Sequence, residues 1–159
     1  MKLIILSLLL SINLAYAKEL TKIGSALLEY DVLFFSVDVY EITYFRNDMG
    51  NEELVLDYKV DVEKKHSIEG WNVGLDHLFK EKPVYKEKAK WILNNTIDLK
   101  DGDKFVIRKN IHEVILIKNN QEMAKVIDPI IAEMIFEPWL GKKPIDKKIK
   151  SKLLNREDS

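Results

Sequence analysis

The chain has 159 residues, of which 47% are hydrophobic and 32% are charged, as in an ordinary folded protein. Its formal net charge of -1 lacks the strong excess of lysine and arginine typical of nucleic-acid-binding proteins, so we expect no nucleic-acid partner. The absence of cysteine excludes disulfides, cysteine nucleophiles and thiolate metal sites.

Residues 1–17 are typical of a secretory signal peptide. Lys2 precedes an apolar core over residues 3–10, and Ala15 and Ala17 supply the small residues of a cleavage site. An uncleaved membrane anchor is the alternative, but the apolar core is shorter than the roughly 20 residues of a spanning helix. We therefore expect export and a single mature domain over residues 18–159.

The first strands are expected over residues 21–29 and 32–45. Alternation in the second strand divides it into two faces. We expect the face with Leu33, Phe35, Val37 and Val39 to lie in the core. The opposite face, expected to line a cleft or to meet solvent, carries Phe34, Ser36, Asp38, Tyr40, Ile42 and Tyr44.

A third strand is expected over residues 52–59, after a turn rich in asparagine and glycine, with Tyr58 on the same side as its leucines. Helices are expected over residues 62–80 and 84–97. Gly70 and Gly74 lie one turn apart in the first helix, which suggests that another backbone or a ligand approaches that face closely.

The second half predicts an antiparallel meander followed by helices. Strands are expected over residues 103–109, 112–118 and 121–127, with a tight turn at Asn119-Asn120. Asp128-Pro129 is typical of a helix start, and a last helix is expected from Asp146. This order of elements predicts an α+β fold, with one antiparallel sheet and its helices gathered on one face.

Aromatic and hydroxyl side chains on the early strands are the candidate ligand-binding residues. Tyr40, Tyr44 and Tyr58 would line a cleft with polar tips, and Ser36 and Trp71 are weaker candidates. The alternative is that these side chains only pack in the core.

Histidines do not indicate a metal site. His66 and His77 are roughly 16 Å apart along one expected helix, and His112 lies far along the chain. We therefore predict no metal, no cofactor and no catalytic residue.

The segment from Lys142 to Arg156 is rich in lysine. It would contact an acidic envelope protein or an anionic membrane surface, or else it is the solvated face of a terminal helix.

Several short motifs together resemble the bacterial, exported branch of the chalcone isomerase-like family. The matching residues are Ile23-Gly24, Val39-Tyr40, 54–58, Asp61-Val62, 99–103, Ile127-Asp128 and 139–154. The resemblance implies an open-faced sandwich, in which helices cover a curved antiparallel sheet and leave a cleft between the layers. It also implies that export leads to the periplasm.

The enzymes of that family cyclise chalcones with an arginine and a threonine on early strands and a tyrosine and an asparagine on central helices. No arginine occurs in residues 24–29, and Ser36 carries the only hydroxyl where the threonine is expected. Cyclisation needs a cation for the substrate phenolate. The resemblance therefore favours the non-catalytic branch, whose members bind fatty acids with an arginine and a tyrosine, although that arginine is also not found at the matching strand of this sequence.

We expect an exported, non-enzymatic domain that binds a small apolar or amphipathic, fatty-acid-like ligand between sheet and helices. An interaction module for an envelope protein is the alternative. An isomerase with a rebuilt site is a third interpretation.

Overall fold

The computed structural model describes residues 19–33 and 35–156. The expected signal peptide lies outside the described residues. Within the described residues, no helix combines the length and the apolar character needed to cross a bilayer.

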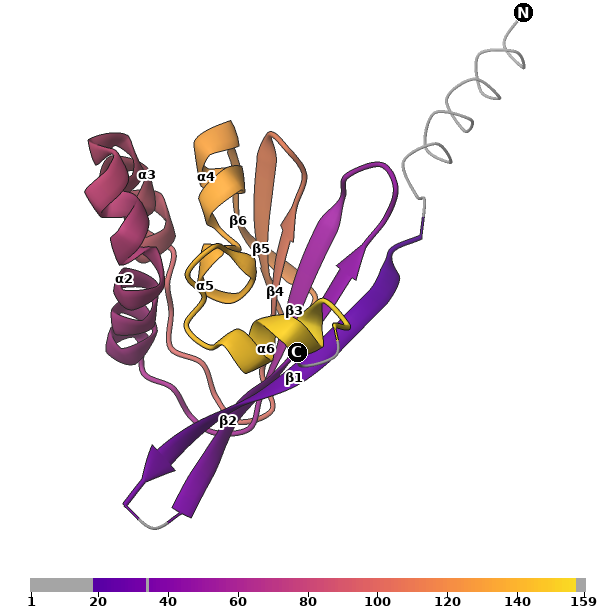
Figure 1. Ribbon diagram of the computed structural model, residues 1–159, viewed down its shortest axis with the longest axis vertical. Coiled ribbons are helices and arrows are strands. Elements are labelled where there is room, and N and C mark those ends of the chain that lie inside the picture. Colours follow the sequence, from indigo (N-terminus) through magenta and orange to yellow (C-terminus); the bar gives the residue numbers. More distant parts are fainter. Residues whose placement is uncertain (1–18, 34, 157–159) are drawn as a thin grey trace, which may run out of the picture.

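The fold is an open antiparallel sheet of six strands with helices on one face (Figure 1), as the sequence predicts. The strands pair in their order along the chain, and two helices separate β3 from β4. The strands are β1 (Thr21–Val32), β2 (Phe35–Arg46), β3 (Glu52–Tyr58), β4 (Lys104–Lys109), β5 (Glu113–Lys118) and β6 (Gln121–Ile127). The helices are α2 (Lys64–Glu81), α3 (Pro83–Asn94), α4 (Pro129–Met134), α5 (Glu137–Leu140) and α6 (Lys147–Leu153).

The buried face of β2 is the opposite of the expected one. Tyr40, Ile42 and Tyr44 are at most 7% exposed, whereas Leu33 is 92% exposed at the end of the hairpin. Antiparallel pairing sets Tyr40 against Tyr58, so the aromatic faces of β2 and β3 lie together beneath the helices. The prediction was wrong because alternation defines two faces without indicating which one the helices cover.

The hairpin of β1 and β2 extends beyond the rest of the sheet (Figure 1). Pairing between β2 and β3 begins at Tyr40, so within the described sheet residues 29–32 pair only with residues 35–38. Ser36 lies in this extension.

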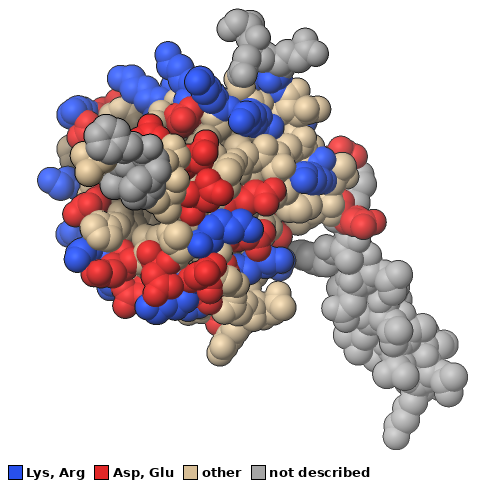
Figure 2. All heavy atoms as spheres, turned by 90° about the horizontal axis from the view of Figure 1, so that it is seen from below, with Lys and Arg blue, Asp and Glu red and all other residues tan. Residues whose placement is uncertain are grey.

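The uncovered face of the sheet carries cross-strand ion pairs. Arg108 Nε lies 2.7 Å from Glu53 Oε2, and Lys125 Nζ lies 2.6 Å from Glu113 Oε2. Acidic and basic side chains are also intermingled over the face seen in Figure 2. These pairs supply a charged outer surface, as expected for an antiparallel sheet with one face in water.

Two glycines allow close packing of the helices. A Cβ atom at Gly24 of β1 would overlap the backbone carbonyl oxygens of Lys152 and Leu153, at the end of α6. A Cβ atom at Gly74 of α2 would lie 2.6 Å from Pro138 Cβ. The expected close approach is therefore confirmed at Gly74, whereas a Cβ atom at Gly70 would meet no described atom within 4 Å.

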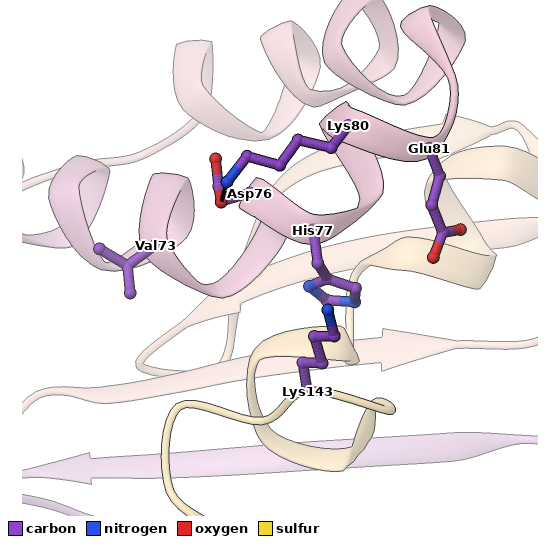
Figure 3. A pocket seen from close by; sticks show the side chains of 6 residues that line it. All are labelled: Val73, Asp76, His77, Lys80, Glu81 and Lys143. Carbon is purple, nitrogen blue, oxygen red and sulfur yellow. Dashed lines mark hydrogen bonds and ion pairs between the residues drawn. The ribbon is translucent and has the colours of Figure 1, made fainter.

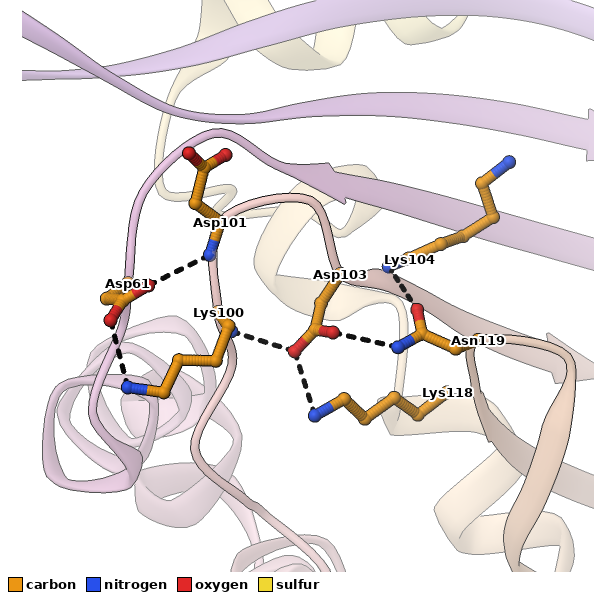
Figure 4. Close-up of polar contacts among 7 residues, drawn as sticks. All are labelled: Asp61, Lys100, Asp101, Asp103, Lys104, Lys118 and Asn119. Atoms are coloured by element: carbon orange, nitrogen blue, oxygen red, sulfur yellow. Dashed lines mark hydrogen bonds and ion pairs between the residues drawn. The ribbon is translucent and has the colours of Figure 1, made fainter.

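A polar network closes the lower turns of the sheet (Figure 4). Lys118 Nζ lies 2.8 Å from Asp103 Oδ2, and Asn119 Nδ2 donates to Asp103 Oδ1 at 2.8 Å. Asn119 and Asn120 have φ angles of 48° and 67°, which confirms the tight turn.

Candidate functional site

Two of the predicted tyrosines form a buried pair on the helix-facing side of the sheet. Tyr40 and Tyr58 are each 7% exposed, and they lie opposite each other on β2 and β3. Their ring centroids are 5.2 Å apart with the planes inclined at 55°. The sheet register thus brings together two predicted site residues that are distant in sequence.

Two tryptophans extend this pair toward the helices. Trp139 of α5 donates a hydrogen bond from Nε1 to the Tyr40 hydroxyl at 2.9 Å. Its ring meets the ring of Trp71 edge to face, with centroids 5.3 Å apart. Trp71 is half-buried on α2 and is therefore the ring of the four nearest to solvent. We call Tyr40, Tyr58, Trp71 and Trp139 the aromatic cluster.

The hydroxyl groups of the tyrosine pair differ in their hydrogen bonding. The Tyr40 hydroxyl accepts from Trp139, whereas the Tyr58 hydroxyl has no hydrogen-bond partner among the residues that the structure describes. Burial raises the pKa of Tyr40 to about 12, an effect that the bond from Trp139 partly offsets. Burial, and then the neighbouring Tyr40, also raise the pKa of Tyr58. Both hydroxyls therefore keep their protons at neutral pH and can act as donors.

Tyr44 belongs to a different environment. Its hydroxyl donates to Glu52 Oε1 at 2.5 Å, and Lys109 Nζ lies 3.0 Å from Glu52 Oε2. Burial, followed by the neighbouring Glu52, raises the pKa of Tyr44, and Arg46 opposes this shift. Tyr44 is four residues from Tyr40 along β2, which is roughly 13 Å in an extended strand. This group is a charged network and is separate from the aromatic cluster.

The remaining candidates lie at different depths. Ser36 is exposed on the extended hairpin, where its hydroxyl donates to Asp31 Oδ1 at 2.6 Å. Among the described residues, Trp71 joins the cluster through its ring contact with Trp139. The signal that could have linked Trp139 to Tyr40 is tertiary, because 99 residues separate them.

Two shallow hollows on the surface lie apart from the aromatic cluster. The first, of about 370 Å³, lies beside α2 and is lined by Val73, Asp76, His77, Lys80, Glu81 and Lys143. Figure 3 shows Lys143 directed toward His77 across this hollow. The second, of about 290 Å³, is lined by Leu20, Asn51, Arg108, Lys109, Asn110, Glu113 and Ile115. None of the predicted site residues lines either hollow.

His77 links α2 to α5. Its Nε2 atom lies 3.1 Å from Glu137 Oε2, and both side chains are largely buried. His66 instead lies in an exposed contact with Glu69. Over the described part of the chain, no cluster of three histidine, aspartate or glutamate side chains could hold a metal ion.

Comparison with known proteins identifies the family and the fold. The model of a family described as chalcone isomerase-like matches residues 38–155. The crystal structure of a fatty-acid binding protein from Arabidopsis thaliana superposes with a TM-score of 0.68 at 10% identity, covering 87% of this chain and 88% of that one. At 10% identity, this similarity shows a shared fold and nothing more. A search of curated protein sequences finds no match.

Proposed function

Because the chain belongs to the chalcone isomerase-like family, we propose that it is an exported, non-enzymatic domain that binds a small apolar or amphipathic molecule. The ligand would lie between the sheet and the helices, against the aromatic cluster. The observation that carries this proposal is the Tyr58 hydroxyl, a hydrogen-bonding group on the buried face with no partner among the described residues.

The Tyr58 hydroxyl is accessible as well as unpaired. Among the described residues, no side-chain nitrogen or oxygen is both fully enclosed and without a hydrogen bond, so this hydroxyl keeps a narrow contact with solvent. A ligand oxygen could therefore reach it and supply the bond that the protein does not. Because leaving a largely buried hydroxyl unpaired is costly, such a ligand oxygen would be favoured.

The interior is occupied by the protein's own rings, so binding requires a ring to move. Trp71 is the natural candidate, because it is half-buried and contacts the cluster through one edge-to-face pair with Trp139. Rotation of Trp71 away from Trp139 would open a path from the surface of α2 toward Tyr40 and Tyr58. The ligand would then replace ring contacts with contacts of its own, so binding need not leave a cavity in the free protein.

The fatty-acid binding protein from Arabidopsis supports this proposal by analogy, since its fold is shared along most of both chains. An enzymatic role has weaker support. Among the described residues, no cation acts on the hydroxyls of the tyrosine pair, whereas an enzyme that holds a phenolate there would need one.

Ligand uptake is tested on protein purified from the exported fraction, with native mass spectrometry followed by solvent extraction. We expect a reproducible extra mass that is lost on denaturation. The Trp71→Ala variant should take up a fluorescent acyl probe faster than the unmodified protein. The matched control is Trp91→Ala, which removes a partly buried tryptophan on α3, outside the cluster. A clean apo mass together with no probe uptake by either protein would refute ligand binding.

Export to the periplasm is part of the proposal and has its own test. The intact mass of the exported protein should correspond to a chain that begins at Lys18. Replacing both Ala15 and Ala17 with leucine should block this processing, because signal peptidase requires small residues there. A full-length mass in the exported fraction would contradict cleavage.

A second candidate function has one observation in its favour. Five lysines on and before α6 are exposed and form no ion pair within the described residues. Lys150 differs from them, because it is half-buried and donates a hydrogen bond to the Gly141 carbonyl at 2.6 Å. These free lysines would suit an anionic membrane surface or an acidic envelope protein. Reversing the charges of Lys147 and Lys148 should then abolish sedimentation with vesicles containing phosphatidylglycerol. The exposed lysines are Lys142, Lys143, Lys147, Lys148 and Lys152.

A further inference from the structure

We infer that the polar end of the bound molecule is an uncharged hydrogen-bond acceptor, such as a hydroxyl, carbonyl or ester oxygen, held by Tyr40 and Tyr58. A free carboxylate would not suit this position. The inference rests on the proposed function, because it assigns the class of ligand that the same interior would take.

The tyrosine pair offers donors that need an acceptor. Tyr58 has no hydrogen-bond partner among the described residues, and its side chain is more than nine-tenths buried. Tyr40 accepts from Trp139 Nε1, which leaves its own proton available. Two hydroxyl protons on neighbouring strands therefore face a layer of aromatic rings, and an oxygen atom with two lone pairs could accept from both.

No positive charge is placed to balance an anion at the pair. Burial is the main cause of the raised pKa of both Tyr40 and Tyr58, and no charged side chain of the described chain contributes to either shift. Tyr44 provides the contrast within the same strand, since Glu52 and Arg46 both act on its hydroxyl. A carboxylate buried against Tyr40 and Tyr58 would lose its hydration without gaining a counterion, which is strongly unfavourable.

The hairpin beyond the pair supplies no cation, because residues 23–45 contain no lysine or arginine at all. A β-bulge at Val39 interrupts the alternation of β2, since Leu28 pairs with Tyr40 and the next residue, Glu29, pairs with Asp38. Asp38 and Glu29 therefore lie on the side of the hairpin opposite to Tyr40. An anionic head group that reaches the pair along the hairpin would gain no counterion there.

A cationic head group does not meet the hydrogen-bonding requirement of the pair. A quaternary ammonium has no lone pair, so it would leave the protons of Tyr40 and Tyr58 unpaired in the interior. An uncharged oxygen meets both conditions, since it accepts hydrogen bonds and needs no counterion. The hydroxyl pair, with no cation beside it among the described residues, thus selects for a neutral polar end.

The test compares molecules that share one sixteen-carbon chain and differ in their charge. Hexadecanol, methyl palmitate, palmitate and hexadecyltrimethylammonium are titrated at pH 8, the neutral compounds below their solubility limits and the charged compounds below their micellar concentrations. Binding is followed by tryptophan fluorescence and native mass spectrometry. We expect the two neutral compounds to bind about tenfold or more tightly than either charged one. Tyr58→Phe should weaken neutral binding by about fivefold, as expected for one hydrogen bond. The control Tyr85→Phe removes the hydroxyl of a tyrosine outside the cluster, which donates to Glu133 Oε1 at 3.0 Å in a partly buried position, and should leave binding unchanged.

The outcomes separate the ligand class from the proposed function. Preferential binding of palmitate or of hexadecyltrimethylammonium would overturn the neutral class while leaving ligand binding in place. Unchanged neutral binding by a folded Tyr58→Phe protein would overturn the role of the hydroxyl pair. Failure of all four compounds to bind would overturn both proposals. Circular dichroism of each variant ensures that a loss of binding is read only from folded protein.

Discussion

The contact between α2 and α5 is tested by exchanging two glycines of the same helix for alanine. Gly70 and Gly74 lie one turn apart in the interior of α2, so each replacement should gain about 1 kcal/mol of helix propensity. Only Gly74 faces α5, where the added Cβ atom would lie 2.6 Å from Pro138 Cβ and 2.7 Å from Pro138 Cγ. The pair of variants therefore separates packing from propensity.

The size of the effect follows from the required displacement. Ordinary contacts of this kind begin at 3.4 Å, so α2 and α5 must separate by about 0.8 Å to accept the methyl group that Gly74→Ala adds. Overpacking a close contact of this kind costs about 1–3 kcal/mol. Gly74→Ala should accordingly destabilise the protein by about 0–2 kcal/mol, whereas Gly70→Ala should stabilise it by about 1 kcal/mol.

Urea unfolding followed by tryptophan fluorescence and far-ultraviolet circular dichroism measures the difference. The propensity gain is common to both variants, so their difference in unfolding free energy equals the steric cost of about 1–3 kcal/mol. With a slope of about 2 kcal/mol per molar urea, the midpoints should differ by roughly 0.5–1.5 M. Equal midpoints for Gly70→Ala and Gly74→Ala would refute the close approach of Pro138 to α2.

Three further changes test the polar contacts. The bonds from Lys118 and then Asn119 lower the pKa of Asp103 to about 2, so its contribution to stability is present above its ordinary pKa and is lost as pH falls from about 4 to 2. Asp103→Asn should make the melting temperature less dependent on pH across that window. An equally large loss of pH dependence in Asp101→Asn, in the same turn, would contradict the assignment of this effect to Asp103. Asp128→Ala removes a side chain that accepts from two backbone amides at the start of α4, and calorimetry should show a loss of about 1 kcal/mol or more. Tyr44→Phe removes a hydrogen bond to the Glu52 carboxylate and should cost about 1.5–3 kcal/mol in urea unfolding, and an unchanged midpoint would argue against that bond.

The elements that the sequence predicts well are those determined by local chemistry. Asp128 and Asp146 accept hydrogen bonds from the first backbone amides of their helices, as their places before α4 and α6 indicate. The Asn119-Asn120 turn depends on positive φ angles that asparagine tolerates. Such features can be predicted because the interacting atoms lie within a few residues of one another.

The features that the sequence does not reveal depend on which layer covers which face. Alternation in β2 separates Tyr40 from Val39 but is silent on the position of the helices, so the buried face was assigned the wrong way round. The bond between Trp139 and Tyr40 joins residues that are 99 positions apart in the sequence. Of the candidate residues, Tyr40 and Tyr58 meet directly and Trp71 joins them through Trp139, whereas Ser36 lies on the hairpin. Their binding of a ligand remains a prediction.

Because α6 packs on Gly24 of β1, the fold can be completed only after α6 has been synthesised. The last helix of the described chain lies directly on its first strand, with the α6 backbone where a side chain on β1 would otherwise be. During synthesis, β1 emerges well before α6, so this contact can form only after α6 has been made. A chain truncated before Asp146 would lack this cover, and β1, an edge strand paired only with β2 in the described sheet, should then be cut more readily by proteases while the central meander can still pair.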